Sequence, residues 1–315
     1  MAFEVAAEQD QARLEAAAVE LARAAGERAL AAFRSTTASL EFKGPKQDNP
    51  VTALDRDIES FLRRELRAAF PDHGLLGEEH ADDIGAQAAY VWVIDPVDGT
   101  VNFASGLPLW GVSIGLLCRG EPVVGCIWLP VGPTLRPGVY HARRGGGARF
   151  EAEPIHVSQA ADERGQVMSL PGGYLRAFRF RRPKPGTARA ARPLPDQRTL
   201  GSCTAELALI ASGALRAGIF IEPSIWDVAA GALIIREAGG EVLTWRESSW
   251  RRFEQFQPAP PRRGEGPPAL RHWAQPLLMG APDAVARVVA RLAWHPRLPK
   301  RLRQLLGRLQ GPIQG

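Results

Sequence analysis

Cysteine is scarce in this chain: only Cys118, Cys126 and Cys203 occur among 315 residues. Their spacing matches no metal-binding cysteine pattern, which excludes a cysteine-based metal centre. Cys118 and Cys126 fall in apolar runs that are typical of strands. We therefore expect reduced thiols in the core or next to a site, as in proteins of the cytoplasm.

Long hydrophobic runs are also lacking. No stretch approaches the roughly 20 apolar residues that cross a bilayer, so the sequence predicts no membrane span. The N-terminus carries Glu4, Glu8 and Asp10 where a signal peptide would be basic. We therefore expect a cytoplasmic protein. No internal repeat is evident.

Acidic residues are missing from the end of the chain. Beyond Asp283 there are seven basic residues and no acidic ones, while the rest of the chain holds 32 basic against 34 acidic residues. The net charge of +5 therefore belongs to the tail and says little about a substrate. Residues 294–315 read as a basic amphipathic segment. Binding of nucleic acid, anionic lipid or a partner protein through this tail is the non-catalytic alternative for the whole chain.

What the chain does have is a pair of aspartates directly after an apolar run. Val91–Ile94 is typical of a short buried strand, which we expect to stop at Asp95 because Pro96 cannot donate to a sheet. Asp95 and Asp98 would then share a tight loop that Gly99-Thr100 follows. Carboxylates this close repel each other unless a cation lies between them, and Mg²⁺ prefers such ligands. The alternative is an Asp-Pro turn followed by an Asp-Gly turn.

Periodicity predicts the elements around this stretch. Helical spacing of apolar residues indicates one long amphipathic helix over residues 8–34 and a second helix that Thr52 caps. Two apolar runs, 110–118 and 123–129, predict a β-hairpin. In the second half we expect helices over residues 201–213 and 228–237 and a strand over residues 219–221.

The stretch Trp92–Phe103 resembles a signature of the inositol monophosphatase family, the lithium-sensitive, Mg²⁺-dependent sugar-phosphate phosphatases. Three further segments are similar to motifs of that family and follow in the same order: Asp48–Asp55, Gly77–Glu79, and Trp226–Gly231 running on to Glu237–Gly240. The resemblance covers residues 10–245, with a weaker match to about residue 290.

The resemblance implies a fold and a division of the chain. It implies an α/β (α+β) layered αβαβα sandwich like that of inositol monophosphatase and fructose-1,6-bisphosphatase. Because members of the family are often dimers, it also implies a homodimer. Residues 1–160 would form an N-terminal α+β half and residues 161–293 a C-terminal α/β half, with the metal site between them. Pro, Arg and Gly concentrate in residues 254–275, which predicts a mobile insertion there.

The resemblance also implies a set of metal ligands. Glu78, Asp95 and the carbonyl of Val97 would hold a first Mg²⁺. Asp95, Asp98 and Asp227 would hold a second, with Asp95 bridging, and two or three ions would bind in all. From the residues alone, Glu78 reads equally as a solvated loop acid and Asp227 as a plain helix N-cap.

Catalytic and substrate-binding roles follow from the same resemblance. Thr100, with Asp55 and Glu78 behind it, would orient and deprotonate the attacking water, although Asp55 reads equally as a first-turn helix acid. The backbone N–H groups of Gly99 and Thr100 would cradle the phosphate. The substrate-binding set implied in this way is Asp98, Gly99, Thr100, Cys203, Glu222 and Asp227.

Substrate choice depends on a position where this chain departs from the family. Members that prefer inositol phosphate carry a glutamate seven residues before the aspartate of the Trp-Asp motif, and here that residue is Phe220. Glu222 lies two residues on, hence on the same face of a strand, and is expected to replace it.

The sequence therefore predicts a Mg²⁺-dependent phosphomonoesterase. Its substrate would be a small phosphorylated polyol or sugar of the inositol 1-phosphate type, hydrolysed by attack of a metal-activated water. Fructose 1,6-bisphosphate, histidinol phosphate and 3′-phosphoadenosine 5′-phosphate are the alternatives. The complete carboxylate set favours this enzyme over the non-catalytic alternative.

Overall fold

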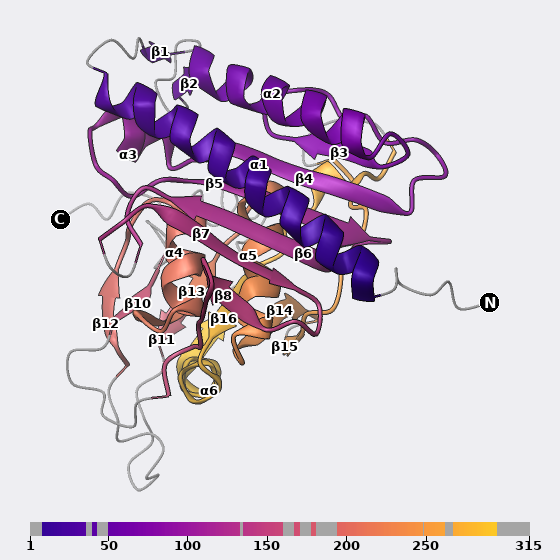
Figure 1. Cartoon of the computed structure of the whole chain (residues 1–315). Helices are drawn as coiled ribbons and strands as arrows, with labels where there is room; N and C mark the ends of the chain where they lie inside the picture. The colour runs from indigo at the N-terminus through magenta and orange to yellow at the C-terminus, as the bar shows by residue number, and fades with distance from the viewer. Residues whose placement is uncertain are drawn as a thin grey trace, which may run out of the picture.

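Helices and sheets alternate in five layers in this computed structural model (Figure 1). The order is helix, sheet, helix, sheet, helix, which confirms the αβαβα fold that the sequence predicts. The structure describes residues 8–35, 40–42, 50–132, 135–159, 167–170, 178–180, 194–247, 249–261 and 267–294. The Asp48 end of the first motif, most of the basic stretch 176–198 and the tail beyond residue 294 lie outside these ranges.

The first two layers are a helix pair and a seven-stranded sheet. The helices α1 (Glu8–Arg34) and α2 (Ala53–Ala69) cover one face of the sheet. A stripe of fully buried alanines at helical spacing, from Ala18 to Ala29, lets α1 lie close against the strands. The strands, in spatial and chain order, are β3 (Gly74–Gly77), β4 (Tyr90–Asp98), β5 (Gly111–Cys118), β6 (Glu121–Leu129), β7 (Gly138–Arg143), β8 (Ala148–Phe150) and β9 (Glu153–Pro154). Only the β3–β4 pair is parallel, and β5 and β6 form the predicted hairpin.

The middle layer holds α4 (Cys203–Ala211) and α5 (Ile225–Glu237) between the two sheets. Both helices are apolar on almost every side, as expected of helices that are buried on two faces. The helix predicted over residues 228–237 begins earlier, at Ile225, so Asp227 lies in its first turn.

The second sheet and one helix complete the stack. Its spatial order is β12 (Asp196–Arg198), β10 (Val167–Ser169), β13 (Leu215–Phe220), β16 (Leu277–Gly280), β14 (Glu241–Arg246) and β15 (Ser249–Arg252). The helix α6 (Pro282–Arg291) packs on its outer face through Val285 and Val288. The short elements are β1 (Leu40–Phe42), β2 (Pro50–Thr52), α3 (Thr100–Ala104), β11 (Phe178–Phe180), the 3₁₀ helix η3 (Leu270–His272) and β17 (Leu292–Trp294). Within the described ranges, every helix is too short or too polar to cross a membrane.

The segment after β15 is packed where the structure describes it, although composition predicts a mobile insertion over residues 254–275. Phe256 and Trp273 are each only 1% exposed and lie edge to face, with ring centroids 4.7 Å apart. Phe253 joins both rings. We call residues 253–261 and 267–275 the arm. The high content of Pro and Arg in this segment favoured the prediction of a mobile segment and gave no sign that these three aromatic residues would be buried.

Candidate active site

A β-bulge brings the two aspartates of the Trp92–Phe103 stretch to the same side of β4. Contrary to the expected stop at Asp95, the strand runs through Pro96 to Asp98. Asp95 pairs with Ser113 and Asp98 with Gly111, so β4 carries one residue more than β5 between these pairs. In a regular strand, side chains three residues apart lie on opposite faces, and one extra residue cancels that alternation. The bulge also accommodates the missing N–H of Pro96.

A third carboxylate reaches these two from α5. Three carboxylate oxygens, one from each of Asp95, Asp98 and Asp227, all lie within 4.8 Å of one another. Ser224 is the N-cap of α5, and Asp227 in the first turn accepts the Ser224 backbone N–H at 2.8 Å, which forms a capping box. The rest of the Asp227 carboxylate faces the acidic cluster. The plain N-cap interpretation of Asp227 is therefore wrong, because Ser224 is the N-cap, but the capping-box role is compatible with a ligand role.

The start of α4 fixes the Asp98 carboxylate. Its Oδ2 accepts the Ser202 hydroxyl and the Thr204 backbone N–H, each at 2.6 Å. Both donors lie at the N-terminus of α4, where free N–H groups point out of the helix. One oxygen of Asp98 is thus held by the second half of the chain.

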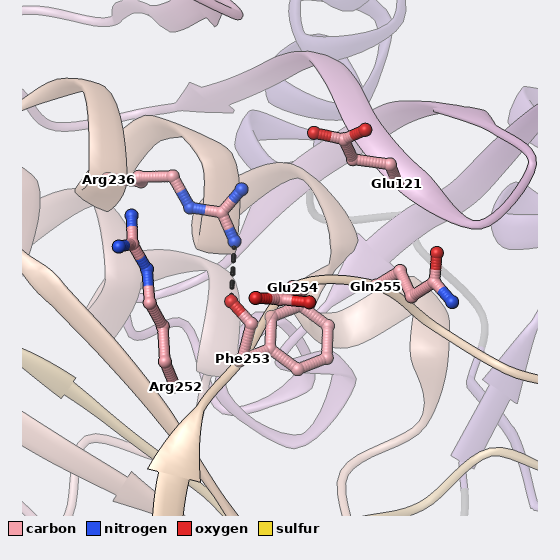
Figure 2. Close-up of a pocket in the computed structure, with 6 residues that line it drawn as sticks. All are labelled: Glu121, Arg236, Arg252, Phe253, Glu254 and Gln255. Carbon is pink, nitrogen blue, oxygen red and sulfur yellow. Dashed lines mark hydrogen bonds between the residues drawn. The ribbon is translucent and has the colours of Figure 1, made fainter. Parts of the chain in front are cut away.

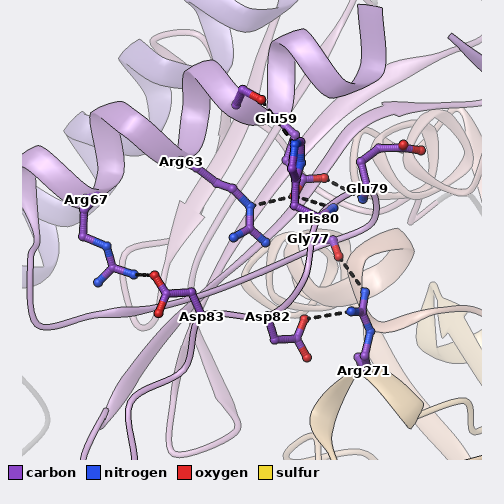
Figure 3. A network of polar contacts seen from close by, with 10 residues as sticks. Glu59, Arg63, Arg67, Gly77, Glu79, His80, Asp82, Asp83 and Arg271 are labelled. Atoms are coloured by element: carbon purple, nitrogen blue, oxygen red, sulfur yellow. Dashed lines mark hydrogen bonds and ion pairs between the residues drawn. The ribbon is translucent and has the colours of Figure 1, made fainter. Parts of the chain in front are cut away.

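Glu78 lies in a loop that is held from two sides (Figure 3). On one side, Glu59 of α2 is fully buried and accepts the backbone N–H of Glu79 at 2.7 Å. On the other side, Arg271 of the arm donates to the carbonyl of Gly77 at 3.0 Å. Gly77 has no room for a side chain because the Glu59 carboxylate fills that space. The residues on both sides of Glu78 are therefore fixed.

A cavity of about 200 Å³ joins these groups. It is lined by Glu78, Asp95, Val97, Asp98, Gly99, Thr100, Val101, Gly201 and Asp227. Gly99 ends the bulged strand with a φ of 84°, and a Cβ there would come within 2.9 Å of the Leu109 carbonyl oxygen. This close approach explains why glycine is required between the aspartates and α3.

A larger cavity of about 400 Å³ lies where the arm leaves β15 (Figure 2). It is lined by Glu121, Arg236, Arg252, Phe253, Glu254 and Gln255. Its charges balance, and two of them are already paired: Arg236 donates to the Phe253 carbonyl at 2.9 Å, and Glu121 binds Arg144 at 2.7 Å. It contains none of the predicted site residues. The smaller, acidic cavity is therefore the candidate active site.

The acidic cavity is lined by four carboxylates and by no basic side chain. Burial, with the charges of Asp227 and other neighbouring acids, raises the pKa of Glu78 to about 8. Burial and the charge of Glu78 raise the pKa of Asp95 well above its usual range. Burial also raises the pKa of Asp98, against hydrogen bonds from Ser202 and from backbone N–H groups, which lower it. Such a cluster favours either bound protons or a bound cation.

The residues present fit a divalent cation. Oδ1 of Asp95 is buried and has no hydrogen-bond partner among the described residues. A buried carboxylate oxygen without a partner costs free energy unless a proton or a metal ion satisfies it. The other groups of the cavity supply oxygen ligands only, which is the donor set that Mg²⁺ prefers.

Three predicted site residues do not line this cavity. Asp55 is buried in the first turn of α2, close enough for its charge to act on Glu78 and Asp95. Cys203 is half-buried at the start of α4, and burial raises the pKa of its thiol well above the usual range. Glu222 is exposed and has a φ of 53°.

The expectation that Glu222 shares a strand face with Phe220 is wrong. The strand β13 ends at Phe220, whose side chain is 3% exposed and packs in the core between the sheets. The chain turns through Ile221 and Glu222 before α5 begins, so the alternation of a strand no longer applies.

Sequence reasoning missed four residues that support the site: Ser202, Thr204, Glu59 and Arg271. Ser202 carried a signal, since it lies at the start of the helix predicted over residues 201–213 and serine there is typical of an N-cap. Glu59 follows Asp55 by one helical turn and therefore shares its face of α2. Thr204 acts through its backbone and Arg271 lies in a low-complexity segment, so neither carried a usable signal.

The five-layer fold and its clustered carboxylates beside a glycine turn define a metal-dependent phosphatase. A model of the inositol monophosphatase family matches residues 10–272, and the chain belongs to this family. The chain is 34% identical over 207 residues to Nus factor SuhB of Xylella fastidiosa, over 65% of this chain and 72% of the relative. It is 35% identical over 230 residues to the histidinol-phosphatase of Chlorobaculum parvum, over 73% of this chain and 85% of the relative. An inositol monophosphatase from Anabaena has a similar structure, with a TM-score of 0.64 and 25% identity over 90% of this chain and 97% of that one.

Proposed function

We propose that this phosphatase hydrolyses a small phosphorylated polyol of the inositol 1-phosphate type with Mg²⁺ as its cofactor. The observation that carries the proposal is the convergence of Asp95, Asp98 and Asp227 beside Gly99-Thr100, where one buried Asp95 oxygen has no hydrogen-bond partner in the part of the chain that the structure describes. A phosphate dianion could approach so many carboxylates only if cations lay between them.

We assign the metal ligands to the residues of the acidic cavity. Glu78, Asp95 and the Val97 carbonyl would hold one Mg²⁺, and Asp95, Asp98 and Asp227 a second. The Val97 oxygen already accepts the Thr100 hydroxyl at 3.2 Å, and its other lone pair is available to a cation. When bound, Mg²⁺ would neutralise the phosphate oxygens, lower the pKa of water and stabilise the leaving oxygen.

The chain's own groups would orient the water and receive its proton. Because the Thr100 hydroxyl donates its proton to the Val97 carbonyl, its oxygen can accept a hydrogen bond from a water in the cavity. Glu78, with Asp55 behind it, would take up the proton of that water. The Gly99 N–H helps lower the pKa of Asp98 by a hydrogen bond, so we assign the main phosphate contact to the Thr100 N–H.

We assign the contacts that select the polyol to three groups at or near the cavity. Phe220 is buried in the core and is therefore not placed to contact a substrate. We propose Glu222 and Cys203 at the edge of the substrate site and Asp227 as the acceptor of a substrate hydroxyl. Histidinol phosphate is the second candidate, because a histidinol-phosphatase is among the relatives that match along most of their length. Assembly as a homodimer, and binding of nucleic acid or anionic surfaces by the tail 294–315, stay predictions.

Phosphate release tests the proposal. The purified full chain would be assayed with inositol 1-phosphate, histidinol phosphate, fructose 1,6-bisphosphate and 3′-phosphoadenosine 5′-phosphate, each with Mg²⁺ and with excess EDTA. We expect Mg²⁺-dependent release that is fastest with inositol 1-phosphate. A higher kcat/KM for histidinol phosphate would replace the substrate assignment, and equal rates with Mg²⁺ and EDTA would overturn the metal assignment.

A further inference from the structure

A single arginine of the arm touches the neighbours of two proposed metal ligands. Arg271 donates through Nη2 to the carbonyl of Gly77, directly before Glu78, at 3.0 Å. Its guanidinium also lies 5.7 Å from the ring centroid of Trp226, directly before Asp227. Glu78 and Asp227 come from different halves of the chain, so Arg271 links the two halves at the site.

A third contact fixes the orientation of the guanidinium. Nη1 of Arg271 lies 3.3 Å from a carboxylate oxygen of Asp82, which follows the Glu78 loop (Figure 3). The side chain of Arg271 is only 28% exposed. A planar guanidinium can donate along two edges while it stacks on an aromatic ring with its face, which a lysine ammonium cannot do.

The described parts of the arm are anchored on both sides of Arg271. Trp273, two residues further on, is buried against Phe253 and Phe256. Ala259 and Ala269 exchange backbone hydrogen bonds of 3.0 and 2.9 Å across the arm. Another backbone hydrogen bond, from Phe256 to the Gly120 carbonyl at 2.8 Å, ties the arm to the β5–β6 turn.

The site needs such a link because its carboxylates repel one another. Glu78 and Asp227 line the same small cavity, where Asp227 also lies within 4.8 Å of Asp95 and Asp98, so these acids push one another away when no cation is bound. Glu59 holds the far side of the Glu78 loop, and its hydrogen-bond partners among the described residues lie in α2 and in that loop, not in α5. Among the described contacts, the guanidinium of Arg271 is the group that touches both segments.

We propose that Arg271 is a positioning residue that sets the separation of Glu78 and Asp227 and thereby the affinity of the site for Mg²⁺. The inference rests on the proposed function, because it takes these two acids as metal ligands. Arg271 does not line the cavity and takes no part in the chemistry. It acts by keeping both ligand segments at the spacing that a bound ion requires.

The test is the binding of Mg²⁺ alone to the full chain, measured by titration calorimetry without substrate. Arg271→Ala should raise the Kd for Mg²⁺ about tenfold, the size of effect seen when partners that orient metal ligands are removed. The Mg²⁺ concentration for half-maximal phosphate release should rise by the same factor, with kcat at saturating Mg²⁺ within about threefold of the wild type. Arg271→Lys should recover only part of the affinity.

Arg246→Ala is the matched control. Arg246 donates to Gln275 at the end of the arm at 2.8 Å, and within the described part of the chain its side chain bonds to neither Gly77 nor Trp226. We expect its Mg²⁺ affinity to stay within twofold of the wild type. An unchanged Kd in a folded Arg271→Ala protein, or an equal loss in Arg246→Ala, would overturn the proposal. Wild-type protein that binds Mg²⁺ but releases no phosphate would instead overturn the proposed function and leave this comparison intact.

Discussion

Glu59 and Glu79 are joined by a 2.7 Å hydrogen bond between a buried carboxylate and a backbone N–H, although 20 residues separate them. The same carboxylate accepts Nε of Arg63 at 2.7 Å. Glu59→Ala should therefore lower the free energy of unfolding by about 2–3 kcal/mol, because it leaves the half-buried guanidinium of Arg63 and the backbone N–H of Glu79 without their acceptor. Urea unfolding monitored by circular dichroism measures the change.

The control for this prediction is Glu65→Ala on the same helix. Glu65 also pairs with a neighbouring arginine, Arg64, but its side chain is 41% exposed. Solvent screens that pair, so the free energy of unfolding should change by less than about 1 kcal/mol. Similar losses in both variants would mean that the buried contacts of Glu59 do not carry its effect.

Asp95→Asn should abolish turnover while the fold stays intact. The change removes the proposed bridging ligand and also one of the charges that crowd the cavity. Phosphate release at saturating Mg²⁺, compared with the melting temperature in EDTA, separates the two effects. Near-wild-type turnover would contradict the assignment of two metal ions to this cluster.

Gly99→Ala should destabilise the protein and lower turnover. The backbone at Gly99 has a φ of 84°, and a Cβ would also lie 2.9 Å from both the Leu109 carbonyl oxygen and the Ser202 Cβ. Gly106→Ala provides the control, since Gly106 has a φ of 74° and open space around it. Thermal melts should show a loss of roughly 1–2 kcal/mol in the control from backbone conformation alone and a larger loss at Gly99.

The stability of the metal-free protein should fall as the pH rises from 4.5 to 8. The pKa of Glu78 is raised from 4.5 to about 8 in the folded protein, so in this window the unfolded chain releases a proton that the folded protein keeps. Mg²⁺ competes with that proton, and its stabilising effect should therefore grow with pH. Melting temperatures with Mg²⁺ and with EDTA at pH 5, 6.5 and 8 measure this. A shift that does not depend on pH would contradict it.

Glu222→Ala tests the proposed hydroxyl contact. If Glu222 accepts a substrate hydroxyl, kcat/KM for a polyol phosphate should fall roughly 10- to 150-fold, the equivalent of about 1.5–3 kcal/mol for a hydrogen bond to a charged group. Hydrolysis of a simple aryl phosphate should stay unchanged, because that substrate has no hydroxyl to pair. Equal losses on both substrates would make Glu222 structural, and no loss on either would exclude it from the substrate site.

The residues of the cavity were easiest to predict from sequence where they lie next to one another in the chain. Asp95, Asp98 and Gly99 follow one another within a short segment, and their motif predicts that these three residues lie side by side at one site, as they do in the acidic cavity. The long helix over residues 8–34 was equally accessible, because its apolar period repeats over seven turns.

Prediction failed where distant segments decide the structure. The extension of β4 through Pro96 depends on β5, whose pairing tolerates a bulge. The end of β13 at Phe220 depends on the turn that leads into α5. The burial of Trp273 depends on aromatic partners at Phe253 and Phe256, which local composition does not reveal.

The contact between Arg271 and Gly77 spans 194 residues of chain, and this separation bears on the order in which the protein is made. A ribosome completes every proposed ligand when it reaches Asp227, yet the arm that holds the Glu78 loop is not yet synthesised. Contacts this far apart in sequence form late, because a long loop must close before they contribute. A nascent chain with all its motifs would therefore lack a finished site until the arm emerged.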